Sequence, residues 1–211
     1  MNKPRITEIR INPEDPAWRD LYADGAFFCT LPLELVLRRD LAPGTALDNA
    51  ELDALTFEAE LIPAREKAYQ LLGCGDQSRK RLAEKLQRAG FSHEVIEAVC
   101  DRLEERDYLN DARLAARLAK QFAEEKRWGP RRILPELTRR GIPAGLAREA
   151  VSSLDTDFNE TARAVLQSKY RGRDLTGRAE RNKVFQGLAR FGFDFDTINH
   201  VLSGWDEDDT E

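Results

Sequence analysis

The sequence predicts a mainly α-helical protein in which three tandem three-helix modules follow a small N-terminal α+β domain. The main observation is an internal repeat, because one short pattern recurs with a constant shift of 51 residues. Each copy places two apolar residues four positions apart, then a glycine, then another apolar residue. A glycine suits the end of a helix because it adopts the left-handed conformation easily, and the following apolar residue packs onto the last turn. The copies are Leu82–Leu86–Gly90–Phe91, Ile133–Leu137–Gly141–Ile142 and Val184–Leu188–Gly192–Phe193.

The second observation is that the first 62 residues have a different pattern from the rest. They contain a β-prone run and two further short strands around Asp24-Gly25, a strong hairpin signal. A helix and a second possible helix follow, and Pro63 marks the entry to the helical array. The expected elements are a strand around Ile6–Ile11, a hairpin of Trp18–Ala23 and Ala26–Thr30, and helices Leu31–Arg39 and Asp48–Leu61.

The repeat divides the remaining chain into modules. Each module is expected to contain three helices, the middle one ending at Gly90, Gly141 or Gly192. Gly129-Pro130 suits the start of the second middle helix, because proline at the first helical position sacrifices no hydrogen bond. Pro135 lies inside that helix, where we expect a kink or a displaced start. The expected divisions are 1–62 (N-terminal domain), 63–109, 110–155 and 156–205 (modules), and 206–211 (acidic tail).

Composition limits the class of protein. No apolar run approaches the ~20 residues of a membrane span, and the N-terminus lacks a signal-peptide hydrophobic region. The cysteines, Cys29, Cys74 and Cys100, are odd in number and form no CxxC, and the only histidines are His93 and His200. We therefore expect no disulfide framework, no metal site and a cytoplasmic location.

The net charge of −5 conceals a segregation along the chain. Residues 1–62 carry a net charge of −6, residues 63–205 carry +6, and the tail 206–211 carries −5. A basic array between acidic ends suggests a nucleic-acid or acidic partner. An ordinary solvated helical surface explains the same charges equally well.

The positive charge is concentrated on the middle helix of each module and on the segment that precedes the second one. The third helices are neutral or acidic, as Glu94, Glu97 and Asp101 illustrate in the first module. A helix-turn-helix that reads DNA needs donors on its second helix, so we do not expect sequence-specific reading of DNA by this motif. The candidate partner- or DNA-binding residues are Arg79, Lys80, Arg81, Lys85, Arg127, Arg131, Arg132, Arg139, Arg140, Arg181 and Lys183.

Trp128 stands among several of these arginines and has two interpretations. It could serve as an aromatic platform for an unstacked base. With Gly129 as the cap, however, Trp128 and Ile133 occupy the two positions of a hydrophobic staple, which we favour.

These residues resemble the RecX family of regulatory proteins, negative modulators of the RecA recombinase. The resemblance is strongest in Trp128-Gly129-Pro130-Arg131-Arg132-Ile133, with Glu136-Leu137 and Arg140-Gly141-Ile142 after it. Arg79 to Phe91 resembles the first module of the family, and Leu103 to Leu114 its link to the second. The resemblance implies an elongated, curved array that lies in the groove of the RecA–DNA filament, inhibits strand exchange and ATP turnover, and favours loss of the filament.

The sequence shows no Gly-rich phosphate loop and no paired histidine and nucleophile signature, so we expect no enzyme activity and no cofactor. The expected partner is the RecA nucleoprotein filament, with single- or double-stranded DNA as a further candidate, and the protein is expected to be a monomer without membrane contact. Two other interpretations remain open: a non-specific DNA-binding protein that acts on DNA directly, and a helical scaffold for another partner.

Overall fold

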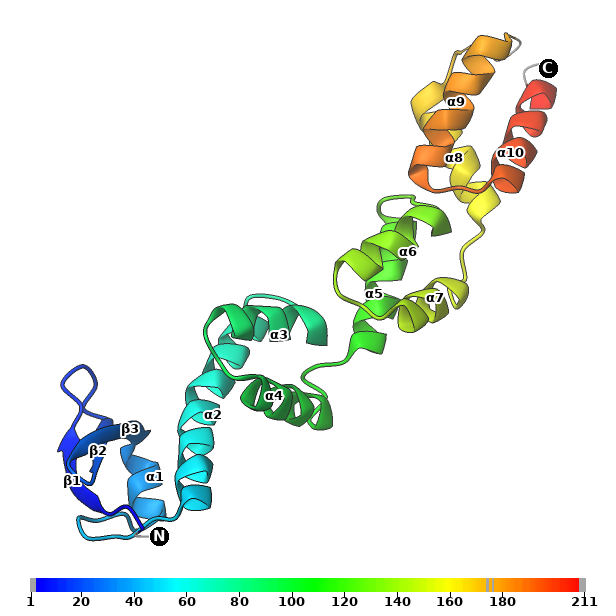
Figure 1. Ribbon diagram of the computed structural model, residues 1–211. Coiled ribbons are helices and arrows are strands. Elements are labelled where there is room, and N and C mark those ends of the chain that lie inside the picture. Colours follow the sequence, from blue (N-terminus) through cyan, green and yellow to red (C-terminus); the bar gives the residue numbers. More distant parts are fainter. Residues whose placement is uncertain (1–2, 174, 176, 209–211) are drawn as a thin grey trace. The chain divides into compact units, whose positions relative to one another are not determined.

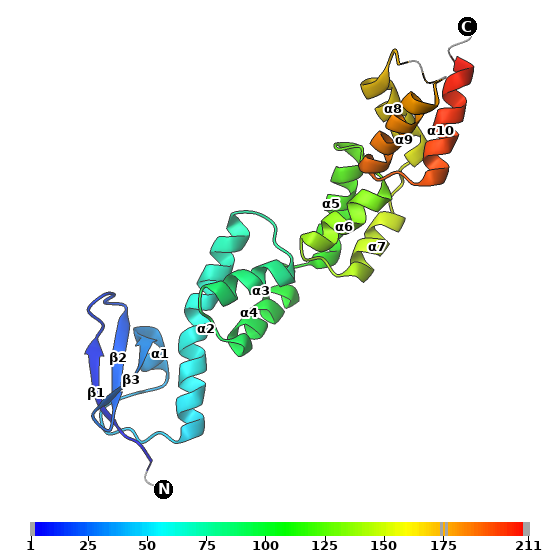
Figure 2. The same cartoon turned by 45° about the horizontal axis from the view of Figure 1, so that its top comes forward.

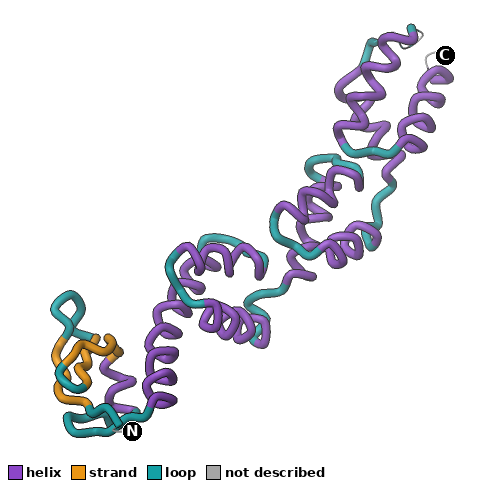
Figure 3. The backbone as a smooth tube through the Cα atoms, viewed as in Figure 1, coloured by secondary structure: helices purple, strands orange, loops and turns teal. Residues whose placement is uncertain are grey.

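The computed structural model describes residues 3–173, 175 and 177–208. Strands occur in the N-terminal part of the chain, and the rest consists of helices joined by loops (Figures 1 and 3). The mainly helical fold with a small α+β domain is therefore confirmed. The elements are β1 (Ile6–Ile11), β2 (Trp18–Ala23), β3 (Ala26–Pro32), α1 (Leu33–Arg38), α2 (Asn49–Gly73), α3 (Arg79–Arg88), α4 (His93–Glu105), α5 (Asp111–Glu124), α6 (Pro130–Arg139), α7 (Ala144–Ser152), α8 (Phe158–Tyr170), α9 (Arg178–Phe191) and α10 (Phe195–Asp208).

The three strands form an antiparallel sheet in the order β1-β2-β3. Asp24 and Gly25 both have positive φ, as the tight hairpin turn between β2 and β3 requires. Figures 1 and 2 show α1 and the first half of α2 on the same side of this sheet. Their core consists of Ile6, Leu21, Leu31, Leu35, Val36, Leu47, Leu55 and Ala59.

Helix α2 corrects one expectation from the sequence. Two helices separated at Pro63 were expected, but α2 runs without interruption from Asn49 to Gly73 with Pro63 inside it. Its residues are buried on both sides of the proline, Leu55 and Ala59 before it and Ala64 and Ala68 after it. The helix therefore continues through Pro63 because burial offsets the lost hydrogen bond and the crowding, a cost of about 3 kcal/mol.

The repeat predicted from the sequence appears as the same helix ending in α3, α6 and α9. Gly90, Gly141 and Gly192 have φ values of +95°, +88° and +95°. The residue after each glycine donates its backbone N–H to the carbonyl five residues earlier, at 3.3, 3.2 and 3.4 Å, and each glycine N–H bonds three residues back. These are the two hydrogen bonds of a Schellman motif. The apolar pairs before the glycines are fully buried: Leu82, Leu86, Ile133, Leu137, Val184 and Leu188.

The second and third modules have separate cores. The second is built on Leu118, Phe122, Ile133 and Leu137 among others, and the third on residues such as Val165 and Phe193. Helix α6 begins at Pro130 as expected and continues through Pro135, so its start is not displaced. Helix α10 extends to Asp208, so the predicted acidic tail begins within a helix, and residues 209–211 lie outside the described part of the chain.

The chain divides into two compact units. One comprises the residues up to Gly75 together with Leu82–Glu105, and the other comprises Asp76–Arg81 together with the residues from Arg106 onward. The first turn of α3 thus belongs to the second unit, which also contains α5 to α10. Among the described residues, no helix combines the length and the hydropathy that crossing a membrane requires.

Candidate functional site

The candidate cations on α3 and α6 lie mainly at the two ends of these helices. Arg79, Lys80 and Arg81 form the first turn of α3, and Arg131 and Arg132 follow Pro130 in the first turn of α6. The first-turn N–H groups form the positive end of a helix, so cations there oppose the dipole of their own helix. The structure shows what some of these arginines contact instead.

The guanidinium of Arg81 donates through Nη2 to the carbonyl oxygen of Arg139, at 2.6 Å. Arg139 is the last residue of α6, so this guanidinium meets the negative end of another helix. Beside it, the Ser78 hydroxyl donates to the Arg140 carbonyl at 2.8 Å and accepts from the Arg81 N–H at 3.3 Å. We call these contacts between the first turn of α3 and the end of α6 the α3–α6 joint.

The start of α6 meets the end of α9 in the same way. Arg132 donates through Nη1 to the Arg190 carbonyl at 3.2 Å. The backbone N–H of Gly129 donates to the Phe191 carbonyl at 2.8 Å, and that of Arg131 to the Gly192 carbonyl at 3.0 Å. These contacts form the α6–α9 joint. Arg81 and Arg132, and their acceptors Arg139 and Arg190, are each related by the 51-residue shift.

Two of the repeated glycines lie inside these joints. A Cβ atom on Gly141 would lie 2.5 Å from Ser78 Oγ, and one on Gly192 would lie 2.4 Å from Arg132 Cβ. A Cβ atom on Gly90 would meet nothing within 4 Å. Gly141 and Gly192 therefore allow both the helix ending and the close approach of another helix, whereas Gly90 allows the ending alone.

Arg79 contributes to the start of α3 through its backbone. Its N–H donates to the Asp111 carboxylate at 2.9 Å, which satisfies one of the donors that a helix N-terminus leaves unpaired. Burial raises the pKa of Asp111, and the bond from Arg79 opposes that rise.

The cations at the end of α6 are paired within their own helix. Arg139 donates to Glu136 at 2.7 and 2.9 Å, and Arg140 donates to the same carboxylate at 2.9 Å. The hydrogen bond from Arg139, supported by Arg140, lowers the pKa of Glu136. In the third module, Lys183 pairs with Glu180 at 2.5 Å, and Arg181 lies half-buried on α9.

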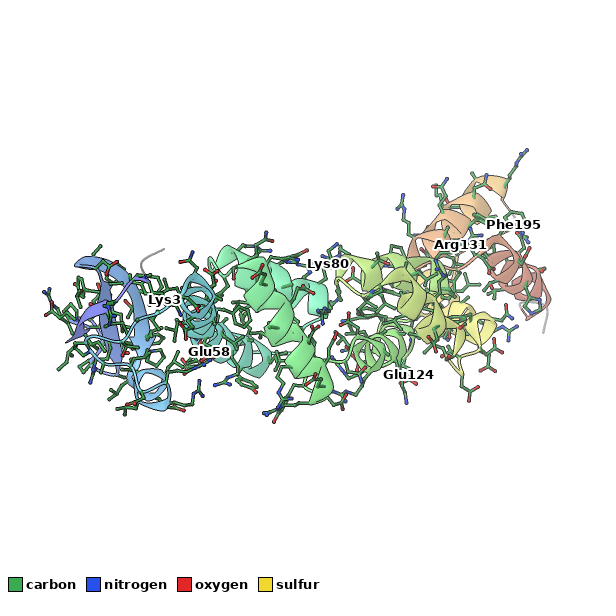
Figure 4. The ribbon with its side chains drawn as sticks, turned by 60° about the horizontal axis from the view of Figure 1, so that its bottom comes forward. Lys3, Glu58, Lys80, Glu124, Arg131 and Phe195 are labelled. Atoms are coloured by element: carbon green, nitrogen blue, oxygen red, sulfur yellow. The ribbon has the colours of Figure 1, made fainter. Side chains whose placement is uncertain are left out.

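Four candidate cations have a different environment. Lys80, Lys85, Arg127 and Arg131 form no side-chain hydrogen bond and no ion pair with the residues that the structure describes. Lys80, Arg127 and Arg131 are exposed, and Lys85 is half-buried. Lys80 and Arg131, both labelled in Figure 4, are the second residues of α3 and α6 and are equivalent in the repeat.

Asp194 is an electrostatic neighbour of Arg131. The charge of Arg131 lowers the pKa of Asp194 after the larger effect of the Thr197 N–H, which donates to that carboxylate at 2.8 Å. Asp194 therefore stays ionised near Arg131.

Trp128 packs as the staple interpretation predicts. It lies against the core cluster that contains Ile133, with its ring centroid 5.0 Å from that of Phe122. The Arg132 guanidinium stands 4.0 Å from the Trp128 ring centroid. The half-buried tryptophan thus packs against its own module and helps to hold Arg132 at the joint.

Sequence reasoning located the cations but missed Ser78 as a joint residue and missed the carbonyl acceptors. The available signal was the placement of arginine in the first turn of a helix, where it opposes the helix dipole.

Within the described residues, no group of three or more histidine, cysteine or acidic side chains is arranged to hold a metal ion.

Comparison with known proteins places the three modules in one family. The chain matches the family models for the first, second and third three-helix domains of RecX over residues 64–103, 110–151 and 155–202. It is 31% identical to the regulatory protein RecX of Clostridioides difficile over 203 residues, which cover 94% of each chain. It is 33% identical to the regulatory protein RecX of Pseudomonas fluorescens over 149 residues, covering 71% of this chain and 96% of that one.

Solved structures show the same fold. A crystal structure of a regulatory protein RecX aligns with a TM-score of 0.68 at 20% identity and covers 95% of this chain and 99% of its own. The structure of RecX from Lactobacillus salivarius aligns with a TM-score of 0.63 at 22% identity, covering 70% of this chain and 97% of its own.

Proposed function

The chain belongs to the RecX family of regulatory proteins, and from this premise we propose that it is a negative regulator of the RecA recombinase. In this proposal it binds in the groove of the RecA–DNA filament and inhibits strand exchange and ATP turnover. The observation that carries the proposal is the repeated placement of Lys80 and Arg131 at equivalent positions of successive modules. Both are exposed, and their side chains form no hydrogen bond and no ion pair with the described residues.

A repeated cation suits a partner that is itself periodic. A nucleoprotein filament presents phosphates and protein side chains at regular intervals, and an array of modules can meet several of them at once. Each cation contributes little alone, but contacts on one chain reinforce each other through effective concentration. Binding that depends on such contacts weakens as salt rises.

We place the protein in the cytoplasm, where a RecA filament forms, and we propose that it acts as a monomer without catalytic activity of its own. None of Cys29, Cys74 and Cys100 forms a disulfide in the described part of the chain, which suits a reducing compartment.

Direct, non-specific binding to DNA is the second candidate function. The same exposed cations support it, since Lys80, Arg127 and Arg131 can meet phosphates of bare DNA. The net charge of −6 on residues 1–62 argues against high affinity for bare DNA.

The experiment that separates these functions measures RecA ATP turnover and strand exchange with the parent chain and with Lys80→Ala, Arg131→Ala and the double variant. Arg148→Ala is the matched control, because it removes an exposed cation from α7, the third helix of the same module as α6. We expect the parent and the control to inhibit equally, and the double variant to inhibit least.

A titration of bare single- and double-stranded DNA across a salt series completes the test. Inhibition of RecA at concentrations below those that bind bare DNA supports the filament as the target. Inhibition that merely follows the affinity for bare DNA supports the second function, and a parent chain without effect on RecA refutes the proposal.

A further inference from the structure

The two joints share one side-chain contact that the proposed function does not use. Arg81 Nη2 lies 2.6 Å from the Arg139 carbonyl and Arg132 Nη1 lies 3.2 Å from the Arg190 carbonyl, and donor and acceptor are 58 residues apart in both. Their immediate neighbours, Lys80 and Arg131, make no such contact. Each first turn therefore contains a cation that meets another helix, with an exposed cation directly before it in the chain.

The chemistry of arginine suits the joint better than that of lysine. A guanidinium is a rigid, planar fork that can meet the carbonyl oxygens at the end of a helix and stack on an aromatic ring at the same time. Arg132 does both, since it donates to the Arg190 carbonyl and lies 4.0 Å from the Trp128 ring centroid. At the equivalent position of the third module the residue is Lys183, which pairs with Glu180 of its own helix.

At the α6–α9 joint the contacts are also close enough to fix these two helices relative to each other. The backbone N–H groups of Gly129 and Arg131 donate to the carbonyls of Phe191 and Gly192. A Cβ on Gly192 would lie 2.4 Å from Arg132 Cβ and 2.5 Å from the Arg132 backbone nitrogen, so no side chain fits there without displacement.

The joints determine where the exposed cations stand. Lys80 is held at the C-terminal end of α6 by the α3–α6 joint, while Arg131 lies at the N-terminal end of the same helix. A helix of ten residues is about 15 Å long, which sets the approximate separation of the two cations.

We propose that Arg81 and Arg132 are positioning residues, which act on the partner through the joints by fixing the placement of Lys80 and Arg131 rather than by contacting the partner. This inference rests on the proposed function, because the partner is the RecA filament. It divides four of the candidate cations into two that bind the partner, Lys80 and Arg131, and two that hold these binding residues in place, Arg81 and Arg132.

The test compares variants that change the joint with variants that change the charge, all in the full chain. Arg132→Lys keeps the positive charge but loses the planar guanidinium, and Arg132→Ala loses both. Gly192→Ala changes no charge but adds a Cβ atom that clashes within the α6–α9 joint. Arg131→Ala removes a contact cation, and Arg148→Lys is the control for exchanging arginine for lysine elsewhere in the module.

The functional measurement is the concentration that half-inhibits RecA ATP turnover on single-stranded DNA, taken across a salt series. Loss of a fixed geometry removes the gain from simultaneous contacts, so Arg132→Lys, Arg132→Ala and Gly192→Ala should each raise this concentration about tenfold or more. Their dependence on salt should match the parent. Arg131→Ala should instead make the logarithmic salt slope shallower by about 1, as expected for one lost ionic contact.

The structural measurement is amide hydrogen exchange at Gly129 and Arg131, whose N–H groups lie in the α6–α9 joint. Exchange there should be faster in both Arg132 variants and in Gly192→Ala, and unchanged in Arg131→Ala and Arg148→Lys. Circular dichroism of each variant checks that the helices remain.

Three results would overturn the inference. One is Arg132→Lys inhibiting as well as the parent, and another is Arg132→Ala reducing the salt slope as Arg131→Ala does, which would make Arg132 a contact residue. The third is unchanged inhibition despite faster exchange at the joint. In each case the parent still inhibits RecA, so the proposed function survives, whereas a parent without effect on RecA refutes both.

Discussion

Alanine at Gly192 is expected to destabilise the third module more than alanine at Gly90 destabilises the first, although the two glycines end equivalent helices. Both have a φ of +95°, so alanine meets the same backbone strain at either position. They differ in their surroundings, because a Cβ on Gly90 has no neighbour within 4 Å, whereas one on Gly192 lies 2.4 to 2.8 Å from atoms of Arg132 and Gly129.

The magnitudes follow from these two contributions. The left-handed conformation costs a residue with a Cβ about 1–2 kcal/mol, which is the whole expected loss in unfolding free energy for Gly90→Ala. Overpacking a tight contact adds about 1–3 kcal/mol, so Gly192→Ala should lose about 2–5 kcal/mol. Two of the three nearest atoms at Gly192 belong to the backbone, and backbone relieves a clash less easily than the end of a flexible side chain.

The assay is urea denaturation of both variants and the parent, combined with hydrogen exchange that assigns the loss to a module. The exchange data are needed because arrays of repeats depart from two-state unfolding. Equal losses at the two positions would refute the reasoning, since they would show that the α6–α9 joint does not constrain Gly192.

Three further predictions concern other parts of the chain. Replacing Glu136 by glutamine should lower the free energy of unfolding by about 0.2–1 kcal/mol at neutral pH, because its arginine partners are exposed. The pKa of Glu136 is lowered, so the stabilisation by the carboxylate is present above the ordinary value of 4.5 and is lost as pH falls through the folded-state value. The urea midpoints of parent and variant should therefore converge in acid, and a constant difference would contradict this. Trp128→Ala should lower the free energy of unfolding measured in urea by about 2–3 kcal/mol, somewhat less than the loss of a fully buried tryptophan. It should also speed hydrogen exchange at the Arg131 amide, and an unaffected amide would mean that Trp128 does not support the joint. Deleting residues 206–211, which carry a net charge of −5, should tighten filament binding at low salt and have little effect at high salt. An unchanged affinity across the salt series would show that these charges do not act on binding.

The sequence predicted the modules well because their information is local. An apolar pair such as Leu137 with Ile133, a glycine after it and an apolar residue after that specify a helix ending without reference to the rest of the chain. The same holds for Asp24-Gly25, whose turn chemistry defines the hairpin.

The continuation of α2 through Pro63 could not be predicted in this way. Local rules favour a break at proline, and the opposing contribution comes from burial of Leu55 and Ala59 on one side and Ala64 and Ala68 on the other. That burial depends on tertiary packing against the sheet and against other helices, which local patterns do not report.

The contacts at the two joints could not be predicted from local sequence patterns for a similar reason. Arg81 and Arg132 each meet a carbonyl 58 residues later in the chain, and a backbone acceptor leaves no trace in the sequence. Charge patterning therefore indicated all these cations as one class, although the structure gives Lys80 and Arg131 different surroundings from their neighbours.

Because the acceptors in both joints include main-chain carbonyls, the connection between modules can be copied by duplicating a stretch of gene. The second module carries a donor, Arg132, at the start of its middle helix and acceptors, the carbonyls of Arg139 and Arg140, at the end of the same helix. A second copy inserted in line would need Gly129, Arg132 and the Gly141 turn, while the side chains at positions 139 and 140 could vary. Chains of this design can thus be lengthened one module at a time, with each added unit carrying its own connector.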